Sequence, residues 1–94
     1  YNGETVKVSD AAILQASAVL AKNTGIFSEP AAAAAFAGYQ SFAGNNQLPA
    51  GSTNVVLLTG SGLKDLNAVQ PLLEIPAAVN PDMASVEAFL KGKI

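Results

Sequence analysis

A chain of 94 residues provides one small domain, and its composition excludes several kinds of function. Only 13% of the residues are charged, the net charge is −2 and Arg is absent, which excludes the basic surface of a nucleic-acid-binding protein. The absence of His and Cys excludes imidazole catalysis, disulfide bonds and thiolate metal sites. The apolar runs are far shorter than the roughly 20 residues of a membrane span, so we expect a cytoplasmic protein with no membrane contact.

The first helix is expected over about residues 10–23. The Ser9 side chain can accept a hydrogen bond from the first turn, and Asp10 suits the positive end of the helix dipole. Apolar and small residues recur at helical spacing through this stretch. Gly25 is placed to end the helix in the left-handed conformation that glycine tolerates.

A second helix is expected from Pro30 to about residue 43. Ser28 is a potential capping residue, Glu29 follows it, and Pro30 suits the first helical position because no donor is needed there. The alanines at 31–35 have the highest helix propensity and let another backbone come close. We therefore expect this helix to be buried against a sheet.

The apolar run NVVLL at residues 54–58 has the pattern of a strand that is covered on both faces. After it, the chain is expected to turn at a Gly-Ser-Gly sequence into a short helix over about 63–69, which Pro71 would end. Prolines interrupt the chain beyond it, until a last helix begins at Asp82 and continues to about residue 90.

The predicted order of helix, helix, strand, helix, helix indicates the α/β class, as a fragment of a parallel three-layer αβα domain. A single strand cannot form a sheet, and parallel strands need neighbours that this sequence does not supply. We therefore expect residues 1–94 to be incomplete without a preceding segment, with the strand's partners on that segment or on another chain.

The turn after the predicted strand, Thr59 to Gly62, is where chemistry is expected. In open parallel sheets, ligands lie beyond the carboxyl ends of the strands, and glycines let the backbone approach a ligand closely. On these residues alone, a simple tight turn remains the other interpretation.

Three motifs add a resemblance to that physical argument. The sequence VVLLTGSGLKD at 55–65 is similar to the strand and turn of threonine synthase, where apolar residues lead into Thr-Gly-X-Gly-Leu-Lys-Asp. GIFSEPA at 25–31 resembles the family's Gly-Ile-Phe-X-Glu-Pro-Ala segment, and VSDAAIL at 8–14 resembles its Val-Ser-Asp helix start. The motifs follow one another in the family's order, and the first of the three is the most specific.

The resemblance implies a fold type II pyridoxal 5′-phosphate enzyme, a lyase of threonine biosynthesis that converts O-phosphohomoserine and water to threonine and phosphate. It also implies that the hydroxyl of Thr59 contacts the pyridine nitrogen and that Gly60 lets the turn pass close to the ring. Glu29 would lie near the pocket, although a carboxylate there also suits the start of a helix.

This sequence lacks two features of the family's pattern. The resemblance implies a lysine that holds the cofactor and a glycine-rich phosphate-binding turn, and both belong to the part of the enzyme that precedes these motifs. None of the five lysines stands in such a context, and Lys64 belongs to the turn motif. We therefore predict no catalytic residue and no metal ligand here, and we expect the chain alone to be inactive.

Two alternatives to the C-terminal portion of a threonine synthase stay open. One is a related pyridoxal-phosphate lyase, similar to threonine dehydratase or cysteate synthase. The other is a catalytically silent fragment that folds by self-association or by joining the missing N-terminal portion. The apolar composition, without enough predicted strands, favours the last of these for the chain alone.

Overall fold

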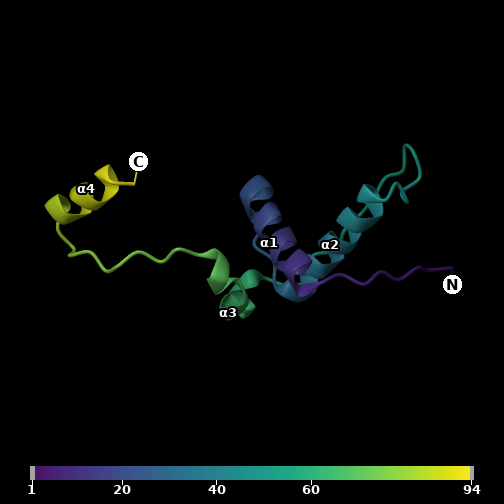
Figure 1. Ribbon diagram of the computed structural model, residues 1–94, viewed down its shortest axis with the longest axis horizontal. Helices are drawn as coiled ribbons and strands as arrows, with labels where there is room; N and C mark the ends of the chain where they lie inside the picture. The colour runs from purple at the N-terminus through teal and green to yellow at the C-terminus, as the bar shows by residue number, and fades with distance from the viewer. Residues whose placement is uncertain (1, 94) are drawn as a thin grey trace.

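A computed structural model describes residues 2–93, and helices are its only regular elements within that range (Figure 1). In chain order these are α1 (Asp10–Thr24), α2 (Pro30–Gly44), the 3₁₀ helix η1 (Gly62–Lys64), α3 (Leu66–Val69), the 3₁₀ helix η2 (Gln70–Leu72) and α4 (Met83–Lys91). None of the described helices is long and apolar enough to cross a membrane.

The first helix, α1, begins and ends with the residues that the sequence predicts. The Ser9 hydroxyl accepts a hydrogen bond from the Ala12 N–H at 3.1 Å, which satisfies one free donor of the first turn. Gly25 follows the helix with φ of 74°, and its N–H donates to the Ala21 carbonyl at 3.0 Å.

The second helix, α2, has the predicted bounds within one residue, but the prediction that Ser28 caps it was wrong. Glu29 occupies the capping position and makes no side-chain capping bond, while Pro30 stands at the start of the helix. Ser28 is instead buried beneath the helix start, because its backbone pairs with a distant turn.

The core of the chain is the contact between α1 and α2 (Figure 1). It consists of Ala16 and Leu20 from α1 and of Ala32, Ala33 and Ala37 from α2, all of them buried. Small side chains let the two helix backbones lie close, and each buried methyl group contributes only about 0.8 kcal/mol. Of the alanines at 31–35, only Ala32 and Ala33 are buried, and a helix covers them here and not the expected sheet.

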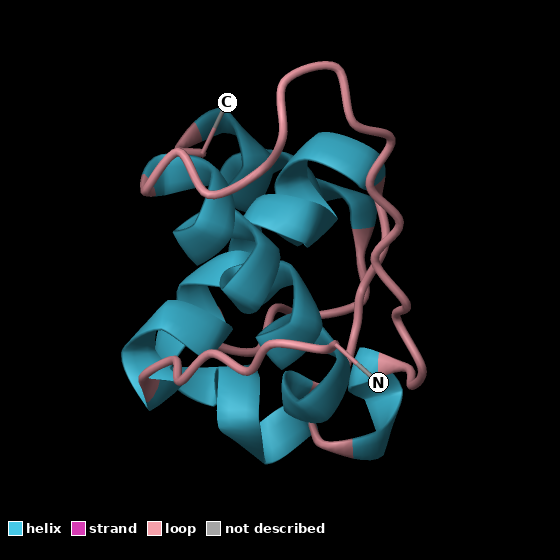
Figure 2. Cartoon of the chain, turned by 90° about the vertical axis from the view of Figure 1, so that its right-hand side faces the viewer, coloured by secondary structure: helices cyan, strands magenta, loops and turns pink. Residues whose placement is uncertain are grey.

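The predicted strand at residues 54–58 is not formed, and Figure 2 shows helices and loops but no strand in the described residues 2–93. Val55 is 80% exposed and Leu57 is 73% exposed. A strand needs a neighbour that receives its backbone hydrogen bonds, and no second strand lies beside it in the described part of the chain. The helical part of the α/β prediction is therefore observed, and the strand is not.

The predicted helix over 63–69 is broken in two at Asp65. There the backbone leaves the helical conformation with φ of −143°, and the Asp65 carboxylate accepts from the Ala68 N–H at 3.3 Å as the cap of α3. Pro71 lies inside η2 and does not end the helical stretch. The α-helical part of this stretch thus starts after Asp65, later than the predicted start at about residue 63.

The C-terminal part of the chain extends away from the α1–α2 pair. Residues 73–80 form no helix and are exposed, and α4 follows them with Asp82 as its cap, as predicted (Figure 1). The chain measures 61 × 26 × 19 Å and its radius of gyration is 18.1 Å, where a compact domain of this length has about 12 Å. Much apolar surface therefore stays uncovered by this chain.

The cap of α4 makes its stability depend on pH. The Ser85 backbone N–H donates to the Asp82 carboxylate at 2.8 Å and the Ser85 hydroxyl donates at 2.7 Å, which holds the pKa of Asp82 below its ordinary value of 3.8. A lowered pKa contributes stability that is present above the unfolded value and is lost as the pH falls through the folded one. We therefore expect the helical carbon shifts of Ser85 and Val86 to weaken as the pH drops from about 5 to 2.

Asp82→Ala is the control for this titration. It removes the cap, so its helical shifts should be weaker at neutral pH and should lack the acid-induced loss. Wild-type shifts that stay constant down to the lowest pH would contradict a role of the ionised Asp82 carboxylate.

Candidate functional site

Two of the motifs that the sequence singles out lie against each other in the structure. Ser28 and Ser61 form an isolated antiparallel bridge. The Glu29 N–H donates to the Gly60 carbonyl at 3.0 Å, and the Gly62 N–H donates to the Phe27 carbonyl at 3.0 Å. We call this pairing of residues 27–29 with 60–62 the motif bridge.

Both glycines of the turn are required by the motif bridge itself. A Cβ atom at Gly60 would collide with the carboxylate of Glu29, and one at Gly62 would collide with the ring of Phe27. The sequence analysis assigned the freedom of these glycines to the approach of a ligand ring. In the structure, side chains of residues 27 and 29 occupy that space, so the glycines serve contact within the chain.

The structure brings all three predicted site residues together. Thr59 and Gly60 lie at the turn, and Glu29 is joined to Gly60 by its backbone and by the approach of its carboxylate. Glu29 and Gly60 are half-buried, whereas Thr59 is exposed. The Thr59 hydroxyl has no hydrogen-bond partner among residues 2–93, and within the same range the Glu29 carboxylate forms no ion pair.

Helix α1 contacts the motif bridge through a buried hydrogen bond. The Ser17 hydroxyl donates to the Ser28 carbonyl at 3.3 Å, and both residues are buried. The Ser28 hydroxyl is buried too, but it has no partner among the described residues. The start of α2, the turn and the middle of α1 therefore form one packed unit, with Thr59 at its edge.

The turn continues into helix through a second local contact. The Ser61 hydroxyl accepts a hydrogen bond from the Leu63 N–H at 3.2 Å, which caps η1. Lys64 is exposed at the end of η1, so its side chain lies in solvent on this chain. The arrangement presents the Thr59 hydroxyl beside a turn that two backbone hydrogen bonds hold, with the Glu29 carboxylate against the neighbouring Gly60.

Sequence reasoning missed the contributions of Phe27 and Ser28 to this site. It treated Ser28 as a cap and gave Phe27 no role of its own. The signal was present in the two glycines, because a glycine that faces a large side chain marks a close approach. No local pattern states which segment makes that approach.

Comparison with known proteins supports the resemblance that the motifs indicate. No family model matches the chain. It is 39% identical over 89 residues to the threonine synthase of Halalkalibacterium halodurans, which is 95% of this chain and 25% of that protein. It is 46% identical over 87 residues to that of Synechocystis sp., which is 90% of this chain and 22% of the relative. The threonine synthase of Methanocaldococcus jannaschii is 34% identical over 95% of this chain and 22% of its own length.

These alignments span nearly the whole chain but only a part of each relative. The chain covers about a quarter of the length of the curated relatives that it matches. The resemblance to threonine synthase is thereby confirmed for this region. The roles of Thr59, Gly60 and Glu29 toward a cofactor stay predictions.

The motif bridge predicts a specific cost for a larger residue at position 60. Gly60→Ala should lower the free energy of unfolding by about 1–3 kcal/mol, because the added methyl group displaces the Glu29 side chain and strains the bridge. Urea unfolding followed by circular dichroism measures this change. In a Glu29→Ala background the same substitution should cost clearly less.

Gly44→Ala is the matched control, because a Cβ atom at Gly44 meets nothing within 4 Å. It should leave stability unchanged or raise it slightly, since alanine favours the helix. Equal costs for Gly60→Ala with and without the Glu29 side chain would show that the two residues do not compete for one space.

The buried serines Ser17 and Ser28 should respond to substitution in opposite directions. Ser28→Ala removes a buried hydroxyl that has no partner, so it should raise the free energy of unfolding by about 1 kcal/mol. Ser17→Ala removes the donor to the Ser28 carbonyl and should lower it by a similar amount. The same urea titration checks both, and a loss of stability in Ser28→Ala would mean that this hydroxyl has a partner.

Proposed function

Because this chain is related to threonine synthases over nearly its whole length, we propose that it is the C-terminal portion of such an enzyme. The observation that carries the proposal is the motif bridge, which joins the family's two motifs and leaves the Thr59 hydroxyl free at their junction. The complete enzyme would convert O-phosphohomoserine and water to threonine and phosphate. Its cofactor would be pyridoxal 5′-phosphate.

The residues of this chain fit one side of that cofactor. An exposed neutral hydroxyl on a turn that is fixed from both ends suits contact with the pyridine nitrogen. We propose that Thr59 makes this contact and that Gly60 and Glu29 hold the turn in place beside the ring. When bound, pyridoxal phosphate supplies the electron sink for chemistry at the amino-acid carbon.

The choice of a hydroxyl at this position has a chemical consequence. A carboxylate beside the pyridine nitrogen would hold a proton there, whereas a hydroxyl leaves the nitrogen largely unprotonated. Thr59 would therefore moderate the electron demand of the ring. The carboxylate of Glu29 is directed at Gly60. The backbone N–H of Glu29 donates to the Gly60 carbonyl, and this bond joins the turn to the start of α2.

The exposed apolar run supports the α/β fold that we propose for the complete domain. Val55 and Leu57 are the most exposed aliphatic residues of the run that leads into the turn, with exposed fractions of 80% and 73%. Their burial requires neighbours on both sides, as a strand inside a parallel sheet has. We propose that the rest of the enzyme supplies those strands, together with the lysine that holds the cofactor and the phosphate-binding turn.

A catalytically silent fragment is the second candidate for the chain alone. The elongated shape and the exposed aliphatic residues favour it, because a chain that buries so little apolar surface gains stability by association. In that case the motif bridge would serve folding only. The two candidates differ in whether the Thr59 hydroxyl meets a cofactor.

The substitution Thr59→Asp tests the proposal in the complete enzyme, expressed with its preceding segment. A carboxylate at position 59 should stabilise the protonated pyridine nitrogen, shift the absorption of the bound cofactor and lower turnover by about tenfold or more. Absorption spectroscopy and steady-state kinetics with O-phosphohomoserine measure both effects.

Thr59→Ser retains the hydroxyl and is the matched control. It should keep the wild-type cofactor spectrum and most of the activity. An unchanged spectrum and rate in Thr59→Asp would remove Thr59 from the cofactor site and leave the silent fragment as the explanation of the bridge.

A further inference from the structure

The side chain of Phe27 lies directly against the turn that carries Thr59. A Cβ atom at Gly62 would collide with the Phe27 ring, so the ring is in contact with the backbone of the turn. The Gly62 N–H also donates to the Phe27 carbonyl at 3.0 Å. Phe27 therefore holds Gly62, three residues after Thr59, through both its backbone and its side chain.

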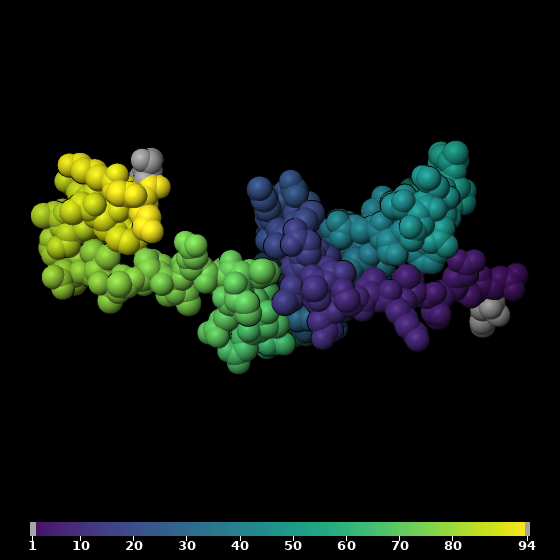
Figure 3. Space-filling view, viewed as in Figure 1, coloured from purple at the N-terminus to yellow at the C-terminus, as the bar shows by residue number. Residues whose placement is uncertain are grey.

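Phe27 also lies where α1 and α3 approach each other. It lines a cavity of about 300 Å³ together with, among others, Ala18 and Ala21 of α1 and Leu66 and Val69 of α3. Figure 3 shows the turn and α3, in green, directly against α1, in purple and blue. The size of the residue at position 27 therefore influences how the turn and α3 lie relative to α1.

Two other side chains at the turn act differently from Phe27. The Ser61 hydroxyl accepts from the Leu63 N–H within the turn itself, so it shapes the turn without fixing it to α1. The Glu29 side chain approaches Gly60 from the start of α2, and it has three rotatable side-chain bonds. An aromatic ring has only two, so once packed it keeps one position with less loss of conformational freedom.

We propose that Phe27 is a positioning residue for Thr59. Its ring, which lies against Gly62 and beside α1, sets where the turn places the Thr59 hydroxyl. Phe27 itself contacts no reacting group in this proposal, and it acts through the turn.

The role of Phe27 toward the cofactor rests on the proposed function, in which the Thr59 hydroxyl meets the pyridine nitrogen. Hydrogen bonds of hydroxyl groups span a range of only about 0.5 Å in length. A turn that shifts by more than this distance would lose the bond, even with Thr59 unchanged. The hydroxyl therefore needs a fixed turn, and the Phe27 ring provides a packed contact that holds it.

Hydrogen exchange in the cofactor-free complete protein tests the positioning without the cofactor. Phe27→Leu keeps an apolar side chain but removes the ring. The amides of Glu29 and Gly62, which form the two bonds of the motif bridge, should exchange at least about tenfold faster. Gly62→Ala displaces the ring without changing Phe27, so it should have the same effect. Mass spectrometry of the peptides that span these residues measures the rates.

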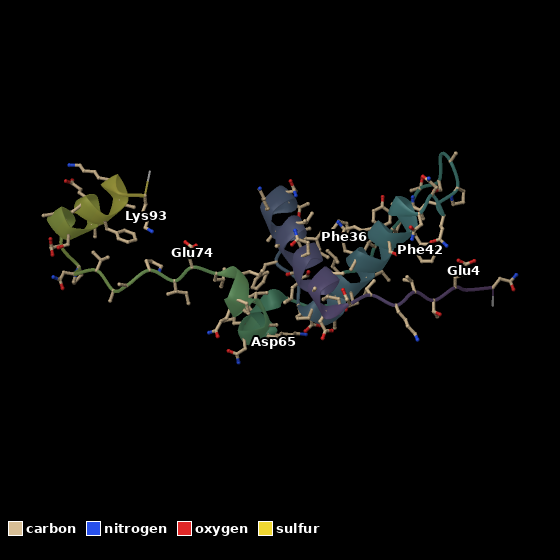
Figure 4. All side chains as sticks on the ribbon, in the orientation of Figure 1. Glu4, Phe36, Phe42, Asp65, Glu74 and Lys93 are labelled. Carbon is tan, nitrogen blue, oxygen red and sulfur yellow. The ribbon has the colours of Figure 1, made fainter. Side chains whose placement is uncertain are left out.

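Phe36→Leu is the matched control, because it makes the same substitution away from the turn. Phe36 stacks on Tyr39 within α2, with ring centroids 6.0 Å apart, and like Phe27 it is half-buried. In Figure 4, Phe36 and Phe42 lie along α2, away from Asp65 at the start of α3. Phe36→Leu should leave the exchange of the turn amides unchanged.

A double-mutant cycle in the complete enzyme with bound cofactor tests whether Phe27 acts through Thr59. Thr59→Val removes the hydroxyl and should shift the cofactor absorption. Phe27→Leu should shift it in the same direction and lower kcat about threefold or more, with little change in KM, because the turn is displaced and substrate binding is not. In the Thr59→Val background, Phe27→Leu should change neither the spectrum nor kcat further.

The outcomes separate the role of Phe27 from the cofactor contact of Thr59. Unchanged exchange of the turn amides in Phe27→Leu would overturn the role of Phe27, whatever the spectrum shows. A spectral effect of Phe27→Leu that persists in full without the Thr59 hydroxyl would overturn it too. A wild-type spectrum and rate in Thr59→Val would contradict the cofactor contact, whereas faster exchange in Phe27→Leu would still support the hold of Phe27 on the turn.

Discussion

The antiparallel pairing of residues 27–29 with 60–62 is the contact on which this chain depends. Two backbone hydrogen bonds join the start of α2 to a turn that lies about thirty residues later. Without these bonds, the turn would follow an extended segment that no other secondary structure in the described chain holds in place. The bridge thus fixes Thr59 relative to α1 and α2 even though no sheet is present to do so.

Small residues make that contact possible, and they also limit what it can stabilise. Gly60 and Gly62 admit the side chains of Glu29 and Phe27, and the alanines of α1 and α2 let the helices approach closely. Buried alanines contribute little per residue, and Leu20 and Val69 are the large aliphatic side chains of the described core. Close geometry is therefore combined with a small core, and many of the larger apolar side chains are exposed.

The family resemblance lies in this local geometry, and the apolar surface that stays exposed agrees with our proposal that the chain is part of a longer enzyme. The two motifs form one local geometry, in which the Thr59 hydroxyl and the Glu29 carboxylate belong to residues at one backbone pairing. A cofactor site also needs walls, a covalent anchor and a phosphate-binding turn. The relatives that the chain matches are about four times its length, and we propose that their remaining part supplies these features.

The sequence by itself determined the elements that are governed by short-range interactions. The start of α1 at Ser9 and its end at Gly25, the start of α2 at Pro30 and the cap of α4 at Asp82 follow from hydrogen bonds and backbone preferences within a few residues. The apolar run at 54–58 is not a strand within the described chain, since its pattern is typical of a strand that other strands surround. Local propensity cannot supply those neighbours.

Only the tertiary structure decided what the two motifs do to each other. Glu29 and Gly60 are distant in sequence, and their spacing along the chain carries no information on contact. The structure also reassigned Ser28 from a cap to a buried bridge residue and showed that the turn glycines admit side chains of the same protein. The physical reason is that backbone pairing between remote segments depends on the path of the intervening chain, which no local pattern encodes.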